Sequence, residues 1–201
     1  MPTISAYLSL SPGPSPITAQ RAVAGRLLRH GLVERFGMHP ADVQLERDGF
    51  GRPRLAGRPD VHFSVSHCPD AVAVLVADAP VGVDVEKIRP YARYAARRVL
   101  ADAELARLAT SSEPDRDFFR LWTLKESYGK ALGVGMSYPL REVRFKVRPD
   151  GMIASNRTDA GFQFEEGFTG LVIAVCRLRS TCPVDTTFKS LAWWPDAEAR
   201  G

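Results

Sequence analysis

Cysteine is scarce in this sequence, and the three residues present are Cys68, Cys176 and Cys182. This odd and widely spaced set matches neither a disulfide framework nor the grouped Cys and His ligands of a structural zinc site. Such a set is typical of a reducing compartment, so we expect the protein in the cytoplasm.

Long hydrophobic runs are also missing from the 201 residues. No stretch approaches the roughly 18 consecutive apolar residues that would cross a bilayer. Residues 1–16 lack the basic start and long apolar stretch of a secretory signal. We therefore expect no membrane partner. The 45% hydrophobic and 25% charged composition is that of an ordinary globular protein.

Dense runs of lysine and arginine with interleaved aromatic residues do not occur, nor does a zinc-finger or RNP-like string. The net charge of +4 and the pI near 9.1 nevertheless favour an anionic partner. Nucleic acid, a phosphorylated cofactor and an acidic protein all qualify by charge. The missing motifs make nucleic acid the weakest of the three, and we expect no nucleic-acid partner.

Apolar spacing and turn residues predict an alternation of short strands and helices. Helices are predicted at 17–36, 91–100, 102–109 and 118–132, with Asp102 as an N-cap and glycines ending the first and last helix. Strands are predicted at 4–10, 43–46, 62–67, 71–77, 81–88, 141–147, 161–166 and 170–178. Residues 48–60 form a stiff basic loop, and the tail beyond Ser180 has no clear pattern.

This order predicts an α+β fold with two halves, each a long helix packed on a small, mostly antiparallel sheet. We place the boundary at the break near residues 78–80, which gives an N-terminal half of 1–79 and a C-terminal half of 80–201. No internal repeat can be aligned in the sequence. If the two halves of one chain together form a single site, a monomer would be sufficient for function.

Three carboxylates stand out in two segments. Asp84 and Glu86 are two apart on a strand, so both side chains project from one face. Glu126 and Lys130 are four apart on the helix 118–132 and share a face there. Separately, these are most often a solvent-exposed strand end and an ordinary helical ion pair. If Glu126 meets Asp84 and Glu86, the three hard oxygen donors favour Mg²⁺, with Mn²⁺ as a substitute.

His67 ends the strand 62–67 after Ser64 and Ser66. A single histidine is more often a structural hydrogen-bonding group than a functional one. Next to two hydroxyl groups and a basic loop, His67 could also help to bind a phosphate.

Four segments in this order resemble the signature blocks of the 4′-phosphopantetheinyl transferases of the surfactin-synthetase-activator type. In chain order the segments are GRPRL, HFSVSH, VGVDVEKI and LWTLKESYGKALGVGM. The resemblance covers about residues 21–178 and implies a fold of two similar α+β halves related by a pseudo-two-fold axis, with the cofactor at their junction. The sequence departs from the family pattern just before Arg21, where some members carry a lysine-bearing segment.

The resemblance also implies a function for each matching residue. Asp84, Glu86 and Glu126 match magnesium ligands, and Lys130 matches a phosphate contact. Catalytic roles fall to Asp84, Glu126 and Lys130, with Glu126 as the base. Contacts to coenzyme A, the co-substrate, are implied for the residues Arg21, Arg52, Pro53, Ser66, His67, Lys125 and Lys130.

The implied reaction is attack of a carrier-protein serine on the β-phosphate of coenzyme A, with release of 3′,5′-ADP. The partner would be an acyl, peptidyl or aryl carrier protein, which is typically acidic, and Arg89, Arg93, Arg97 and Arg98 are candidates to face it. Met136 and Tyr138 in the loop after the helix could add an apolar contact. The alternative in another class is a binding module for coenzyme A or for an acidic protein without catalysis; a nucleic-acid binder is a third option.

Overall fold

The computed structural model of the chain describes residues 4–49, 51–134, 138–148, 150–168, 170–180 and 182–194. The first half contains β1 (Ile4–Leu10), α1 (Ile17–Phe36), η1 (Pro40–Asp42), β2 (Leu45–Arg47), β3 (Pro53–Leu55), β4 (His62–Cys68) and β5 (Ala71–Ala77). The second contains β6 (Val81–Lys87), α2 (Arg93–Val99), α3 (Asp102–Ala109), α4 (Pro114–Leu132), η3 (Leu140–Glu142), β7 (Phe145–Val147), β8 (Ile153–Ser155), β9 (Ala160–Glu165) and β10 (Leu171–Leu178). A last strand, β11 (Phe188–Ser190), follows.

The two halves have the same topology. One sheet has the order β11-β1-β5-β4, and the other has the order β6-β10-β9. In each half the first strand pairs with the last, and the last pairs with the strand before it, all antiparallel. A long helix follows the first strand of each half, and a small hairpin, β2-β3 or β7-β8, follows the helix. The predicted α+β fold of two similar halves is confirmed.

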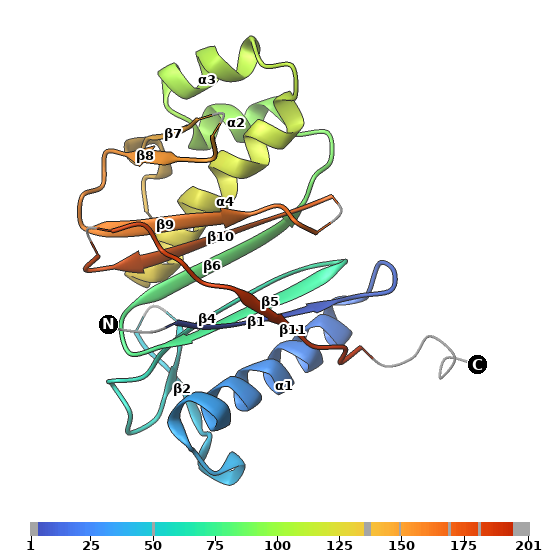
Figure 1. The fold of residues 1–201 in the computed structure, drawn as a ribbon, viewed down its shortest axis with the longest axis vertical. Coiled ribbons are helices and arrows are strands. Elements are labelled where there is room, and N and C mark those ends of the chain that lie inside the picture. Colours follow the sequence, from blue (N-terminus) through green and yellow to red (C-terminus); the bar gives the residue numbers. More distant parts are fainter. Residues whose placement is uncertain are drawn as a thin grey trace.

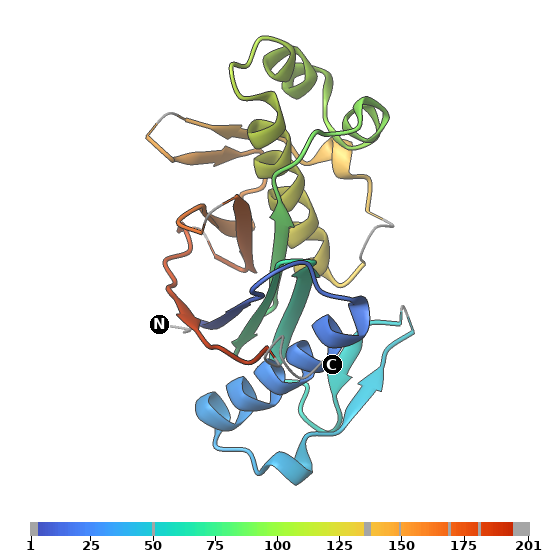
Figure 2. The same cartoon turned by 90° about the vertical axis from the view of Figure 1, so that its right-hand side faces the viewer.

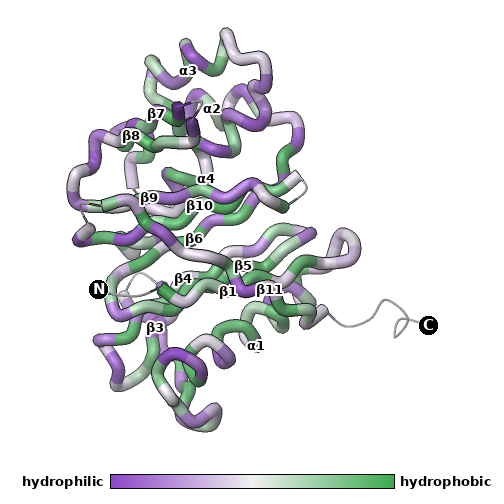
Figure 3. The backbone as a smooth tube through the Cα atoms, viewed as in Figure 1, coloured by the Kyte–Doolittle hydropathy of each residue, from purple (hydrophilic) through white to green (hydrophobic). Residues whose placement is uncertain are grey.

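The layers are held by three apolar cores. The inner core lies between the two sheets, where small residues of β5 such as Ala71, Ala73 and Ala77 meet valines of β6. The outer cores lie under α1 on the first sheet and under α4 on the second. The helices therefore cover the outer faces of the paired sheets (Figures 1 and 2). The most hydrophobic segments run along the central strands (Figure 3).

The change from one sheet to the other occurs between β5 and β6, at the predicted boundary near residue 80. We retain the division into 1–79 and 80–201 as a proposal. The C-terminal segment crosses it, because β11 pairs in parallel with β1 of the first sheet. Trp193 reaches the first half as well, and its ring meets that of His30 at 5.1 Å.

Several predicted boundaries were wrong. The helix predicted from Phe118 begins at Pro114, because proline is well suited to a first helical turn. The N-cap of α3 is Ala101 rather than Asp102. The backbone N–H of Ala101 donates to Glu104, which does the capping instead. The strand predicted at 141–147 is a 3₁₀ turn followed by the three residues of β7.

Short strands β3, β8 and β11 were not predicted at all. Each has three residues, too few for a period of two to be visible in the sequence. Among the described helices, none is long and apolar enough to cross a membrane.

Candidate active site

The site is built where α4 touches β6. Gly82 of β6 faces the helix, and a Cβ atom placed on it would lie 1.9 Å from the backbone oxygen of Ser127 and 2.6 Å from the nitrogen of Ala131. Only glycine allows this approach. Because side chains on a strand alternate, Asp84 and Glu86 share the face of Gly82 and are turned toward α4.

Asp84 and Lys130 form the centre of the site. The Lys130 ammonium donates to Asp84 Oδ1 at 2.7 Å, and the Ser66 hydroxyl donates to the same oxygen at 2.8 Å. Lys130 also donates to Ser66 at 2.9 Å. The other oxygen of Asp84, Oδ2, is buried without a hydrogen-bond partner among the described residues. This carboxylate oxygen therefore has lone pairs that no described residue uses.

Glu126 lies one helical turn before Lys130 and is only 8% exposed. Its Oε1 atom is buried without a hydrogen-bond partner among the described residues. Burial and the negative charge of Asp84 raise the pKa of Glu126 to about 7, while Lys130 acts in the opposite direction. Asp84 and Glu86 both influence the pKa of Glu126, so the structure brings all three predicted carboxylates into one electrostatic cluster.

Glu86 differs from Glu126 in having a cationic partner. Arg89 donates from Nη1 to Glu86 Oε2 at 2.8 Å. Burial and Asp84 raise the pKa of Glu86, whereas Arg89 and Lys130 lower it. Sequence reasoning assigned Arg89 to an interaction surface and missed this contact, because a spacing of three residues indicates neighbouring side chains on a helix and not at the end of a strand.

The three carboxylates fit a divalent cation by donor type. All are hard oxygen donors, and two buried oxygens, one on Asp84 and one on Glu126, have no partner within the described segments. No group of three Asp, Glu, His or Cys side chains in those segments is yet gathered closely enough to hold a metal ion. The donor set fits Mg²⁺ in chemistry, and the side chains would have to converge around it.

Positive charge collects next to the carboxylates at the end of β4. Burial lowers the pKa of His67, and the charges of Lys130 and Arg21 lower it further, with Asp84 opposing them. Arg21, on the first turns of α1, and Lys130, on α4, thus approach one histidine from opposite halves. These three side chains influence one another electrostatically, and their role as phosphate contacts stays a prediction.

Ser66, which was predicted to lie near a phosphate, forms hydrogen bonds within the carboxylate cluster. Its one hydroxyl proton goes to Asp84, and its oxygen accepts from the backbone N–H of Val85 at 3.2 Å and from Lys130. Ser66 therefore positions Asp84 and Lys130. Ser64, which was not predicted as a site residue, makes the matching bond and accepts from Val83 N–H at 3.0 Å.

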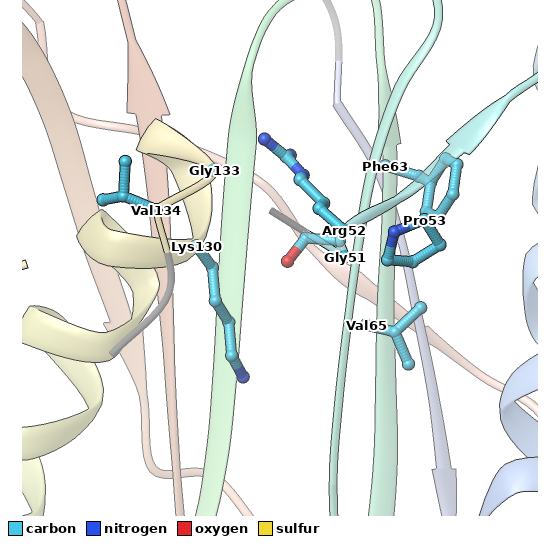
Figure 4. A pocket seen from close by; sticks show the side chains of 9 residues that line it. Gly51, Arg52, Pro53, Phe63, Val65, Lys130, Gly133 and Val134 are labelled. Atoms are coloured by element: carbon cyan, nitrogen blue, oxygen red, sulfur yellow. The ribbon is translucent and has the colours of Figure 1, made fainter. Parts of the chain in front are cut away.

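A cavity of about 260 Å³ opens beside Lys130, between the halves. Figure 4 shows Lys130 on one side, and Arg52, Pro53, Phe63 and Val65 across from it. Arg52 is partly buried, and its side chain crosses to the end of α4, where it packs on Gly133. Burial and the charge of Arg54 lower the pKa of the Arg52 guanidinium. The predicted pair Arg52 and Pro53 thus lines a cavity shared by both halves.

Lys125 is not part of this site, and its prediction as a coenzyme A contact was wrong. The side chain is fully buried on the far side of α4, 2.8 Å from Glu104 of α3. It also donates to the carbonyl oxygens of Leu140 and Val143. Because Lys125 and Glu126 are adjacent on a helix, their side chains are about 100° apart, and only one of them can face β6.

The predicted interaction residues lie in two places. Arg93, Arg97 and Arg98 are exposed on α2, beside Tyr94, which is 74% exposed. Tyr138 is half-buried instead, because its hydroxyl accepts from Arg157 at 2.6 Å and its ring packs on Tyr128. Met136 lies outside the described residues.

Comparison with known proteins supports the family resemblance. Residues 80–176 match a family model described as ACPS, the 4′-phosphopantetheinyl transferase superfamily. A 4′-phosphopantetheinyl transferase of Bacillus subtilis named ffp is 28% identical over 179 residues, covering 86% of this chain and 80% of that protein. The transferase psf-1 of Bacillus pumilus is 34% identical over 138 residues, covering 67% of this chain and 59% of that protein. The chain belongs to the 4′-phosphopantetheinyl transferase superfamily.

The matched region of this superfamily member begins at β6 and ends in β10. It therefore includes the three carboxylates and Lys130, which come from β6 and α4. Among solved structures, a holo-[acyl-carrier-protein] synthase of Thermotoga maritima is similar with a TM-score of 0.43 and 21% identity, over 51% of this chain and 64% of that one.

Proposed function

We propose that this protein transfers the 4′-phosphopantetheine group of coenzyme A to a serine of a carrier protein. The observation that carries the proposal is the meeting of Asp84, Glu126 and Lys130 beside a cavity between the halves. This arrangement combines a base, a phosphate-binding cation and room for a nucleotide in one place. The superfamily membership supports the same reaction.

In the proposed reaction the serine Oγ forms a bond to the β-phosphorus of coenzyme A. The bond from that phosphorus to the oxygen bridging to the α-phosphate breaks, and 3′,5′-ADP leaves with the electron pair. Glu126 takes the serine proton. Glu126 suits this role by position, because it lies one helical turn from Lys130 and has a buried oxygen without a hydrogen-bond partner among the described residues.

The phosphates would be held by positive charge from both halves. Lys130 reaches the centre of the site, and Arg21 of α1 adds a second positive charge near His67. Burial, Lys130 and Arg21 lower the pKa of His67, so this side chain would contribute a hydrogen bond rather than a charge. Asp84, Glu86 and Glu126 would hold Mg²⁺, or Mn²⁺ in its place, and that ion would neutralise charge on the pyrophosphate. Arg52 and Pro53 would contact the adenosine end in the cavity between the halves.

An acidic carrier protein would dock on α2. Its exposed arginines 93, 97 and 98 surround a largely exposed Tyr94, a combination of charge and aromatic surface that is common in interfaces. Exchange of Arg93 and Arg97 for glutamine should raise the KM for the carrier at low salt and leave the KM for coenzyme A unchanged. Equal carrier kinetics would place the docking surface elsewhere.

The function is tested by incubating the full chain with coenzyme A, Mg²⁺ and a panel of apo acyl, peptidyl and aryl carrier proteins. Mass spectrometry should show phosphopantetheine on one serine of at least one carrier. Glu126→Gln and Asp84→Ala should each abolish transfer while circular dichroism stays unchanged, and Asp185→Ala, an exposed acid, should behave as wild type. Failure with every carrier would overturn the assignment.

A binding module without catalysis is the competing function. Such a module would retain the cationic side chains but would have no need of the unpaired oxygens of Asp84 and Glu126. Tightening of coenzyme A binding by Mg²⁺, followed by transfer, would exclude it. The monomeric state and the cytoplasmic location remain predictions.

A further inference from the structure

The two carboxylates of β6 are each bound to a cation from the chain itself. Lys130 contacts Asp84, and Arg89 contacts Glu86. Lys130 is needed beside the phosphates in the proposed reaction. Arg89 has no such role, so its contact with Glu86 requires a separate explanation.

Arg89 is held over Glu86 by three contacts. Its Nη1 donates to Glu86 Oε2 and to the backbone oxygen of Lys87, both at 2.8 Å. Its guanidinium carbon lies 4.6 Å from the centre of the Phe119 ring on α4, a cation–π distance. The side chain of Arg89 is 54% exposed and that of Glu86 is 21% exposed. Arg89 is thus preorganised, yet it can leave toward solvent without disturbing the core.

A guanidinium and a divalent cation repel each other and would share the same carboxylate. From this competition we infer that Arg89 is an internal counter-ion that must leave Glu86 before a divalent cation can bind there. The inference rests on the metal site of the proposed function.

Competition multiplies the apparent metal affinity by the fraction of molecules in which Glu86 is free of Arg89. For a partly exposed ion pair this corresponds to a factor of about five. Removal of Arg89 should therefore tighten metal binding. The direction of the effect is opposite to that of losing a ligand.

The test measures Mn²⁺ binding directly, by electron paramagnetic resonance of the free ion, on the full chain without coenzyme A or carrier protein. Arg89→Gln should bind Mn²⁺ about fivefold more tightly than wild type. Arg93→Gln makes the same charge change at an exposed position of α2 and should alter the affinity less than about twofold. Thermal unfolding confirms that each variant is folded.

A double-mutant cycle separates competition from long-range repulsion. In a Glu86→Gln background Arg89 has no carboxylate to occupy, so adding Arg89→Gln should then change Mn²⁺ affinity less than about twofold. An equal tightening in both backgrounds would overturn the inference and leave only general repulsion. So would unchanged affinity of Arg89→Gln.

The outcomes distinguish this inference from the proposed function. Wild-type protein that binds no Mn²⁺ would overturn the metal site and the counter-ion together. Mn²⁺ binding and transfer activity in wild type, with no tightening in Arg89→Gln, would overturn the counter-ion alone.

Discussion

Glu126 illustrates at the scale of a residue how a group suited to catalysis can weaken the fold. Burial and the nearby charge of Asp84 disfavour the ionised form of Glu126, so the folded state raises its pKa from 4.5 to about 7. The folded state then binds a proton that the unfolded state has lost between these two values. The resulting loss of stability is absent below pH 4.5, grows as the pH rises and is complete above pH 7.

We therefore predict that Glu126→Gln stabilises the protein at pH 8 by about 3 kcal/mol and changes little at pH 5. Urea unfolding in EDTA at both pH values measures this, because EDTA keeps the carboxylate free of metal. Glu142→Gln, at an exposed position, is the control and should show no pH-dependent gain. A gain of equal size at pH 5 would show that ionisation of Glu126 is not its cause.

Lys125 is the opposite case, because its charge stabilises the fold and takes no part in the site. With Glu104 and two carbonyl oxygens it satisfies all three ammonium donors in the core. Glu104 in turn accepts from the backbone N–H groups of Ala101 and Phe145, at 2.8 Å each. This buried pair joins α4 to α3 and to the start of β7.

Lys125→Met should destabilise the protein by about 3–5 kcal/mol, since it leaves the Glu104 carboxylate buried and unpaired. The double variant Lys125→Met/Glu104→Gln should recover part of this loss because no net charge remains in the core. Lys146→Met, an exposed lysine on β7, is the matched control and should cost less than about 0.5 kcal/mol. Chemical denaturation measures all three, and equal stability of the single and double variants would contradict the argument.

At the scale of elements, long apolar segments were predictable and short ones were not. The helix α1, the fully buried strand β5 and the face-sharing pair on β6 follow from spacing alone. The repeat of the two halves could not be found in this way. Residues 40–55 and 140–155 form the same 3₁₀ turn and hairpin, with glycines of positive φ at 51 and 151, yet their sequences share little else. The two segments have the same backbone path because turns determine it, and only a few residues are needed to specify a turn.

The candidate site was only partly predictable for a related reason. The spacing on one strand and one helix placed Asp84, Glu86, Glu126 and Lys130, because local geometry fixes which side chains share a face. It could not show how β4 lies against β6 or which side of α4 Lys125 occupies. Gly82 was the overlooked signal, since a lone glycine inside a strand often marks a close backbone approach.

We predict that Gly82→Ala destabilises the protein by about 3 kcal/mol, at the upper end for overpacking, because the obstructing atoms belong to the backbone of α4. The added Cβ must push α4 away from β6, which would also separate Glu126 from Asp84. Gly13→Ala is the control, since nothing lies within 4 Å of a Cβ at that position. Thermal unfolding compares the two, and a fully stable Gly82→Ala protein would show that the helix does not rest on this strand.

At the scale of the whole molecule, three contacts between the described parts of the two halves stand out beside the active site. Small residues of β5 let the two sheets approach, and β11 carries the end of the described chain back to β1. Lys189 of β11 forms an ion pair with Glu34 of α1, which fixes this return. The third junction is the edge between β4 and β6. Ser64 and Ser66 hydroxyls accept there from the N–H groups of Val83 and Val85, in place of a strand ladder.

The contacts of Ser64 and Ser66 with β6 allow the junction of the halves to be tested separately from catalysis. Ser64→Ala removes the partner of the Val83 N–H group and leaves Ser66, Asp84 and Lys130 in place. An unsatisfied buried donor costs about 1–2 kcal/mol, so we expect that loss of stability and about tenfold faster hydrogen exchange at Val83. Ser15→Ala, whose hydroxyl bond is exposed, should change neither the stability nor the exchange at Val83.

Unchanged exchange at Val83 in Ser64→Ala would mean that other contacts between the two sheets hold this edge closed, and that the hydroxyl only fills space. Faster exchange at Val83, with the amides of β10 unaffected, would locate the weakest point between the halves at the strand that carries the metal ligands we propose.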